Sequence, residues 1–127
     1  MLQRSSRSVT SYPRVLLVDD DLDILEALTT WLQESCHAEV IAFGSAEEAM
    51  AVISPESFDV CVLDYCLTGA DGLTLGAMLR EINPAARLIL VSGELSGNVE
   101  SLAREHGFGR IFTKPVSLET LRDAIVA

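Results

Sequence analysis

The strongest constraint on the fold is an alternation that runs along most of the chain. A short, continuous apolar run is followed by a helical pattern, and this happens five times. Strands that are apolar on both faces are typical of a parallel sheet covered by helices on both sides. The five units share no sequence motif, so the repetition indicates one α/β domain rather than a solenoid. The apolar runs lie at 15–18, 39–43, 60–63, 88–91 and 111–112.

The segments between these runs carry helix signals of their own. Apolar residues recur there at intervals of three and four, as on one face of a helix. Ser45 opens a capping-box spacing, and Asp71 and Ser117 each stand where a helix is expected to begin. We expect Trp31 and the Cys61 thiol to lie in the core. The first helical stripe consists of Ile24, Leu25, Leu28, Trp31 and Leu32.

Charge is unevenly distributed along the chain. The net charge is -10, yet residues 1–14 contain three arginines and no acid, so the remaining residues carry -13. A body this acidic argues against direct binding of nucleic acid, because contacts to the phosphate backbone require positive charge. It suits a small, hard cation instead.

The length of 127 residues fits one domain. We expect the polar, serine-rich residues 1–13 to form a flexible arm and residues 14–127 to form the domain. No apolar run approaches the roughly 20 residues of a membrane-spanning helix, and the first fourteen residues lack the apolar stretch of a secretory signal. The expected location is therefore the cytoplasm, without a membrane partner and with the cysteines reduced.

Polar side chains stand where four of the five predicted strands end. The first strand is followed by three aspartates at 19–21, and the third by Asp64. The fourth ends at Ser92 and the fifth at Lys114, while the second ends without such a group, which fits an edge strand. In an open parallel sheet, ligands bind outside the carboxyl ends of the strands. We therefore expect these groups to share one rim of the sheet.

Such a rim supports a specific chemistry. At an effective dielectric constant near 20, two carboxylates at ~4 Å repel each other by about 4 kcal/mol, and a divalent cation relieves that repulsion. Oxygen ligands with open positions for water and phosphate favour Mg²⁺. Lys114 would add a second positive charge and Ser92 a hydroxyl donor. These groups around the Asp64 carboxylate are suited to phosphoryl transfer onto aspartate.

Five short motifs follow one another in a fixed order over about residues 14–126. In that order and spacing they resemble the receiver domain of two-component response regulators. The resemblance implies a single flavodoxin-like, doubly wound domain with five helices and a five-stranded parallel sheet in the order 2-1-3-4-5. The motifs are Val-Asp19-Asp20, Phe-Asp-Val-Cys-Val-Leu-Asp64, Asp71-Gly72, Val-Ser92-Gly93 and Lys114-Pro115.

The resemblance also implies a role for each residue of the rim. Asp64 would be the phosphorylated aspartate, Ser92 would hydrogen-bond the phosphoryl oxygens, and Lys114 would pair with the phosphoryl group. The peptide between Lys114 and Pro115 would be cis. Mg²⁺ would be held by Asp20, Asp64, the backbone carbonyl of Cys66 and, directly or through water, Asp19.

Partner classes follow from the same resemblance. The phosphodonor would be a phosphohistidine on a sensor histidine kinase or on a phosphotransfer protein. Phosphorylation would switch the face formed by the fourth helix, the fifth strand and the fifth helix, which would bind a downstream target or an output domain. Such a domain is a signalling switch rather than an enzyme, because it catalyses only its own phosphoryl transfer and dephosphorylation.

The sequence departs from the usual pattern of this family at three places. Leu67 and Thr68 replace the Met-Pro pair of many members. Cys66 occupies a position that varies among members and lies near the incoming phosphate. Ile111 stands where many members have an aromatic switch residue, and Phe112 is adjacent to it.

Three other functions fit parts of the pattern. A phosphatase of the haloacid-dehalogenase type also phosphorylates an aspartate at a strand end, but the acid that it needs two residues later is replaced here by Cys66. A nucleotide-binding domain would need a glycine-rich loop where residues 19–21 supply three aspartates. A degenerate receiver, which binds partners without being phosphorylated, is the remaining alternative, although all five key positions are filled.

Overall fold

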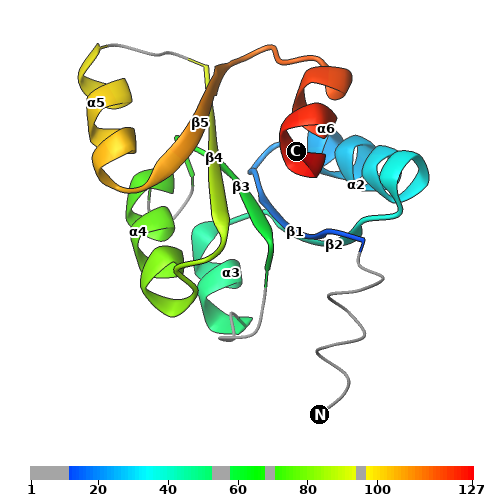
Figure 1. Ribbon diagram of the computed structural model, residues 1–127, viewed down its shortest axis with the longest axis horizontal. Helices are drawn as coiled ribbons and strands as arrows, with labels where there is room; N and C mark the ends of the chain where they lie inside the picture. Colours follow the sequence, from blue (N-terminus) through cyan, green and yellow to red (C-terminus); the bar gives the residue numbers. More distant parts are fainter. Residues whose placement is uncertain (1–11, 53–57, 68–70, 94–96) are drawn as a thin grey trace.

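The computed structural model describes residues 12–52, 58–67, 71–93 and 97–127, and of residue 52 only the backbone. Its centre is a five-stranded parallel sheet with the order β2-β1-β3-β4-β5 (Figure 1). This order confirms the predicted flavodoxin-like fold. Most of the predicted arm at 1–13 lies outside the described residues. The strands are β1 (Arg14–Val18), β2 (Glu39–Phe43), β3 (Val60–Asp64), β4 (Arg87–Ser92) and β5 (Phe108–Thr113).

Five helices alternate with the strands in the part of the chain that the structure describes. Helices α2 and α6 cover one face of the sheet, and α3, α4 and α5 cover the other (Figure 1). The helices, labelled as in Figure 1, are α2 (Leu22–Cys36), α3 (Ala46–Val52), α4 (Gly72–Ile82), α5 (Gly97–Glu105) and α6 (Leu118–Val126). None of the described helices is long and apolar enough to cross a membrane.

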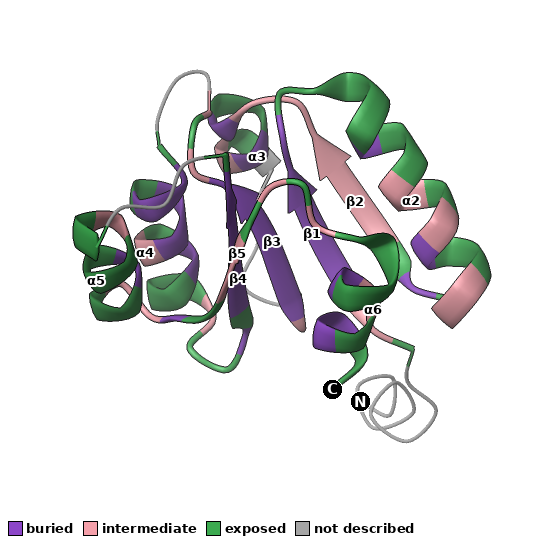
Figure 2. Cartoon of the chain, turned by 90° about the horizontal axis from the view of Figure 1, so that it is seen from above, coloured by how far each residue is buried: buried purple, intermediate pink, exposed green. Residues whose placement is uncertain are grey.

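The inner strands are buried on both faces, which explains their continuous apolar runs. Successive side chains of β3 alternate between the two helical layers, so that Cys61 and Leu63 pack with α3, α4 and α5 while Val60 and Val62 pack with α2 and α6. Figure 2 shows β1 and β3 almost wholly buried and the edge strand β2 only partly buried. The sheet thus separates two cores, one on each face.

Side-chain caps start the helices where the sequence predicted them. Asp71 accepts a hydrogen bond from the main chain of Thr74 at 2.7 Å, and Ser117 accepts one from Thr120 at 3.0 Å. Ser45 likewise accepts from Glu48 at 3.1 Å. Each cap satisfies a main-chain donor that the first helical turn leaves without a partner.

The first helical stripe is less buried than its spacing suggests. Leu25 and Leu32 are buried, but Ile24 is 39% exposed and Trp31 only borders the core between α2, α6 and the sheet. Trp31 is therefore a half-buried residue rather than the core residue expected, whereas Cys61 is buried as predicted. The stripe faces a gap that α6 does not fill completely, as the cavity described below shows.

Candidate functional site

The register of the strands brings the predicted rim residues together. β1 and β3 end in register, so Asp19 comes to lie beside Asp64. β4 and β5 are paired up to Ser92 and Thr113, so Lys114 follows at the same edge. The main-chain N–H of Lys114 also donates to the carbonyl oxygen of Ser92 at 2.7 Å. The carboxyl edge of the sheet thus collects side chains from four strands, next to the point where the strand order reverses.

Lys114 connects two of the aspartates. Its ammonium nitrogen Nζ lies 2.9 Å from Oδ2 of Asp64 and 3.3 Å from Oδ2 of Asp19. Asp64 and Asp19 are only 6% and 9% exposed, whereas the side chain of Lys114 is 27% exposed, so water reaches this contact mainly from the lysine side. One ammonium therefore offsets part, and not all, of the negative charge at the rim.

A cluster of three carboxylates remains around this ion pair. Asp19, Asp20 and Asp64 each offer an oxygen, and these atoms lie within 4.8 Å of one another. Asp19 and Asp64 are buried, while Asp20 is exposed to solvent. Several carboxylate oxygens and an open side are the surroundings that hard divalent cations prefer. The residues therefore fit a divalent cation of this kind.

Burial and neighbouring charges shift the pKa of both members of the ion pair. Burial raises the pKa of Asp64, and the nearby Asp19 raises it further; together they outweigh the Lys114 hydrogen bond, which lowers it. Burial alone would lower the pKa of Lys114, but its contacts with Asp64 and Asp19 outweigh burial and raise it. The shift of Asp64 thus reflects burial first and the neighbouring acid second, whereas the shift of Lys114 reflects the two carboxylates that it faces.

The loop after β3 is held closely against Asp64. The main-chain N–H of Cys66 donates to Oδ1 of Asp64 at 3.3 Å. The N–H of Gly72 donates to the carbonyl oxygen of Tyr65 at 2.9 Å. A Cβ atom at Gly72 would lie 2.2 Å from the carbonyl oxygen of Asp64, so only glycine permits this approach. The Asp71-Gly72 pair thus caps α4 and sets the distance between this helix and Asp64.

A pocket of about 320 Å³ opens above these groups. The buried Ser92 lines it together with Lys114 and the exposed Cys66. Tyr65 lines it as well, although the sequence analysis did not single this residue out; its position directly after Asp64 was the available signal. The pocket gives an incoming group access to the Asp64 carboxylate.

Other parts of the family pattern can also be located. The Lys114–Pro115 peptide is cis, as the resemblance implied. Ile111 is half-buried and packs toward α3, α4 and α5. Phe112 packs on the opposite face of the sheet, with the guanidinium carbon of Arg110 5.6 Å from its ring centroid. Phe112 therefore lies on the wrong face to take the place of an aromatic residue at position 111.

Residues 15–126 match the family described as the response regulator receiver domain. The chain belongs to this family. The receiver domain therefore accounts for nearly all of the sequence, and its fold agrees with the strand order above. Receiver domains are the signalling switches of two-component systems, and members of the family generally use Mg²⁺ at an acidic pocket.

The chain matches part of the length of longer relatives. Nodulation protein W of Bradyrhizobium diazoefficiens is 33% identical over 113 residues, which are 89% of this chain and 49% of that protein. The C4-dicarboxylate transport transcriptional regulatory protein DctD of Rhizobium meliloti is 30% identical over 113 residues, which are 89% of this chain and 24% of that protein. This receiver domain thus spans about half or a quarter of the length of these relatives.

Solved structures show the same architecture. A CheY-like receiver domain protein from Methanospirillum hungatei superimposes with a TM-score of 0.85 at 28% identity, over 91% of this chain and 92% of that one. A Burkholderia pseudomallei response regulator, whose structure holds a phosphorylated aspartic acid, a calcium ion and citrate, has a TM-score of 0.82 at 25% identity. The match covers 89% of this chain and 66% of that protein.

Proposed function

We propose that this receiver domain accepts a phosphoryl group on Asp64 from the phosphohistidine of a sensor histidine kinase or phosphotransfer protein. The observation that carries the proposal is the position of the Asp64 carboxylate. It lies 2.9 Å from the Lys114 ammonium, inside a cluster of carboxylates, and it lines an open pocket. A carboxylate with a cation on one side and access on the other is suited to attack on phosphorus.

Mg²⁺ would be bound by Asp19, Asp20, Asp64 and the backbone carbonyl of Cys66. The cation would supply charge neutralisation at the phosphoryl oxygens. The chain contributes three carboxylates whose oxygen atoms lie within 4.8 Å of one another. Such preorganisation is the main contribution that a protein makes to phosphoryl transfer.

The transfer itself exchanges one bond for another. An oxygen of Asp64 forms a bond to phosphorus, the phosphorus–nitrogen bond of the donor breaks, and the electron pair stays on the imidazole nitrogen. Lys114 stabilises negative charge on the phosphoryl oxygens, and the Ser92 hydroxyl donates to one of them. Both residues line the same pocket as Asp64.

The acyl phosphate would then shift an equilibrium between two states of the domain. Ser92 ends β4, and its carbonyl oxygen is bonded to the N–H of Lys114 at the end of β5. Movement at the site would therefore be transmitted to α5, β5 and α6, which are the fourth helix, fifth strand and fifth helix of the sequence prediction. That face would bind a downstream target or an output domain, whereas the acidic body would not bind nucleic acid directly.

Two comparisons support the chemistry. The Burkholderia pseudomallei response regulator carries a phosphorylated aspartic acid and a calcium ion, and a DrrB receiver domain activated by BeF3 is 26% identical to this chain with a TM-score of 0.82. Lys114 and the three clustered aspartates provide a site for the same kind of modification. We therefore propose that this chain is a cytoplasmic switch operated by phosphorylation.

The test is intact-protein mass spectrometry after incubation with acetyl phosphate. We expect one phosphoryl adduct in the presence of Mg²⁺, none with excess chelator and none in Asp64→Ala. Asp123→Ala is the matched control, because Asp123 is an exposed aspartate on α6 far from the pocket, and it should form the adduct normally. An adduct on Asp64→Ala would refute the assignment.

A second result would favour the alternative. If the folded protein bound Mg²⁺ but formed no adduct with acetyl phosphate or with any phosphorylated histidine kinase, the proposal would fail. A degenerate receiver that binds partners without phosphorylation would then be the better description.

A further inference from the structure

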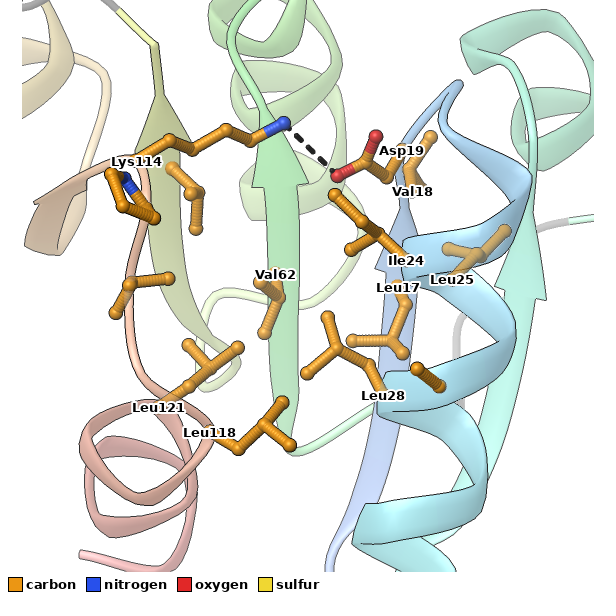
Figure 3. Close-up of a pocket in the computed structure, with 14 residues that line it drawn as sticks. Leu17, Val18, Asp19, Ile24, Leu25, Leu28, Val62, Lys114, Leu118 and Leu121 are labelled. Atoms are coloured by element: carbon orange, nitrogen blue, oxygen red, sulfur yellow. Dashed lines mark hydrogen bonds and ion pairs between the residues drawn. The ribbon is translucent and has the colours of Figure 1, made fainter.

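Another cavity lies on the α2/α6 side of the sheet, beneath the ion pair between Lys114 and Asp19 (Figure 3). Its volume is about 450 Å³. Val62 of β3 lies at its floor, while Leu28 of α2 and Leu121 of α6 point toward it from opposite sides (Figure 3). The cavity and the aspartate cluster are thus neighbours that share one ion pair.

The lining is apolar except at that shared end. Every lining residue other than Asp19 and Lys114 has a hydrocarbon side chain. These two residues are paired with each other at 3.3 Å, and Lys114 also donates to Asp64 at 2.9 Å. The cavity therefore offers a hydrocarbon surface that ends at charges already paired with each other.

The cavity reaches from the surface down to the sheet. Ile24 and Leu118, which line it on α2 and α6, are 39% and 38% exposed, whereas Leu17 and Val62 at its base are 1% and 5% exposed. Contiguous apolar side chains that remain accessible around a concave site are a common mark of ligand-binding grooves. The base between two helices suits a small molecule better than another helix, whose diameter is about 10 Å.

We propose that this cavity binds a small, uncharged molecule with a largely apolar body, and that its occupancy weakens cation binding by the aspartate cluster. The volume lies within the range of roughly 300–1,000 Å³ that is usual for small-molecule sites. A charged ligand would lose its hydration and find no available counter-charge in the lining. An uncharged ligand would instead cover Ile24 and Leu118 and would lose little hydration free energy on binding.

The regulatory effect runs through the shared ion pair and rests on the proposed function, in which Asp19 binds a cation. A ligand packed against the hydrocarbon stem of Lys114 excludes water from the Lys114–Asp19 contact and strengthens it, because the local dielectric constant falls. It also holds Lys114 where it pairs with Asp19. Cation and ligand therefore weaken each other's binding. By thermodynamic linkage, each lowers the affinity for the other by the same factor.

The site is tested with the neutral fluorescent probe N-phenyl-1-naphthylamine, titrated into the full chain in chelator and without a phosphodonor. We expect saturable binding at one site. Val62→Phe, which fills the base of the cavity, should weaken binding by roughly tenfold. Ala27→Phe places the same ring on the exposed wall in α2 and tests the site if Val62→Phe does not fold. Ala51→Phe, at an exposed alanine of α3 outside the cavity, is the matched control and should bind normally.

The regulation is tested by repeating the titration in saturating Mg²⁺, where we expect binding of the probe to weaken about fivefold. Absent binding, or binding unchanged in Val62→Phe and Ala27→Phe, would overturn the site and leave a partner protein to cover Ile24 and Leu118. Probe binding that Mg²⁺ does not change, in a protein that calorimetry shows to bind Mg²⁺, would overturn the regulation alone. Because no phosphodonor is present, failure of Asp64 phosphorylation would not alter the probe titration, so the two proposals fail separately.

Discussion

The two ends of the sheet differ in how their charges are balanced. At the carboxyl end, three carboxylates are clustered and one ammonium group contacts only two of them. At the amino end, Arg14 forms an ion pair with Glu39 at 3.3 Å, and its main-chain N–H donates to Asp59 at 2.8 Å. Arg87 at the same end donates to the carbonyl oxygen of Ala124 at 2.9 Å.

The contrast separates structural charges from functional ones. At the amino end Arg14 pairs with Glu39, and Arg87 neutralises the carbonyl end of α6 through the oxygens of Ala124 and Ile125. At the carboxyl end an excess of negative charge is kept close to buried atoms, which lowers stability unless a cation is bound. Mutations at the two ends should therefore divide cleanly between effects on ligand binding and effects on folding alone.

The largest effect is expected for Gly72→Ala at the carboxyl end. The new Cβ atom would meet the main-chain carbonyl of Asp64, so we expect a loss of about 3 kcal/mol in the free energy of unfolding and weaker Mg²⁺ binding. Gly76→Ala is the matched control on the same helix, because its Cβ would collide with the ring of Phe108 instead. Calorimetric Mg²⁺ titration should distinguish them; equal Mg²⁺ affinity in both variants would show that Gly72 does not position the site.

Arg87→Ala should destabilise the amino end of the sheet without changing the aspartate cluster. Losing two hydrogen bonds to the end of α6 is expected to lower the free energy of unfolding by about 1.5 kcal/mol in urea denaturation. Arg104→Ala, which removes an exposed ion pair with Glu100, should lose only about 0.4 kcal/mol. Mg²⁺ affinity should be unchanged in both, and a change in Arg87→Ala would mean that the two ends are coupled.

Asp20→Asn should give the reverse pattern. Asp20 is exposed, so the free energy of unfolding should change by less than about 0.5 kcal/mol. Removing one of three clustered carboxylates should weaken Mg²⁺ binding about tenfold, which corresponds to about 1.4 kcal/mol. Asp23→Asn, an exposed acid in the first turn of α2 outside the cluster, should leave Mg²⁺ affinity intact. An equal loss of Mg²⁺ affinity in both variants would indicate that the overall negative charge attracts Mg²⁺, and that the three aspartates do not form a specific site.

A smaller effect is expected from pH. The folded pKa of Asp64 is raised, so the folded state keeps this proton to higher pH than the unfolded chain does. Stability that depends on the protonated group is present at low pH and is lost as pH rises through the folded pKa. In chelator, the melting temperature of the wild type should therefore fall relative to that of Asp64→Asn as pH rises from about 4 to 7. A difference that moves the other way would contradict the raised pKa.

The fold was largely predictable because its signals are local. Apolar runs mark strands that are covered on both faces, and side chains such as Ser45 and Ser117 start helices within their own first turn. The prediction for β5 was too short, at 111–112 instead of Phe108–Thr113. β5 is an edge strand, and its exposed Gly109 and Arg110 interrupt the apolar run on which the prediction relied.

The meeting of the rim side chains at one edge of the sheet was predictable from the sequence, but their contacts were not. Strand ends alone indicated that Asp19, Asp64, Ser92 and Lys114 would meet, because parallel strands end at a common edge. That Lys114 binds two aspartates at once depends on side-chain conformations that no spacing encodes. The cavity depends on how far α6 sits from α2, so the exposure of Ile24 could not be derived from its place in a helical stripe.

The bond between the N–H of Lys114 and the carbonyl oxygen of Ser92 has a consequence for redesign. It joins main-chain groups of two strand ends, so exchanging either side chain changes the chemistry of the edge and leaves this hydrogen bond between the ends of β4 and β5 in place. Serine, threonine and alanine could thus be compared at position 92 with this main-chain hydrogen bond kept in place. The backbone sets the spacing between positions 92 and 114, whereas the side chains at these positions set the chemistry and can be exchanged.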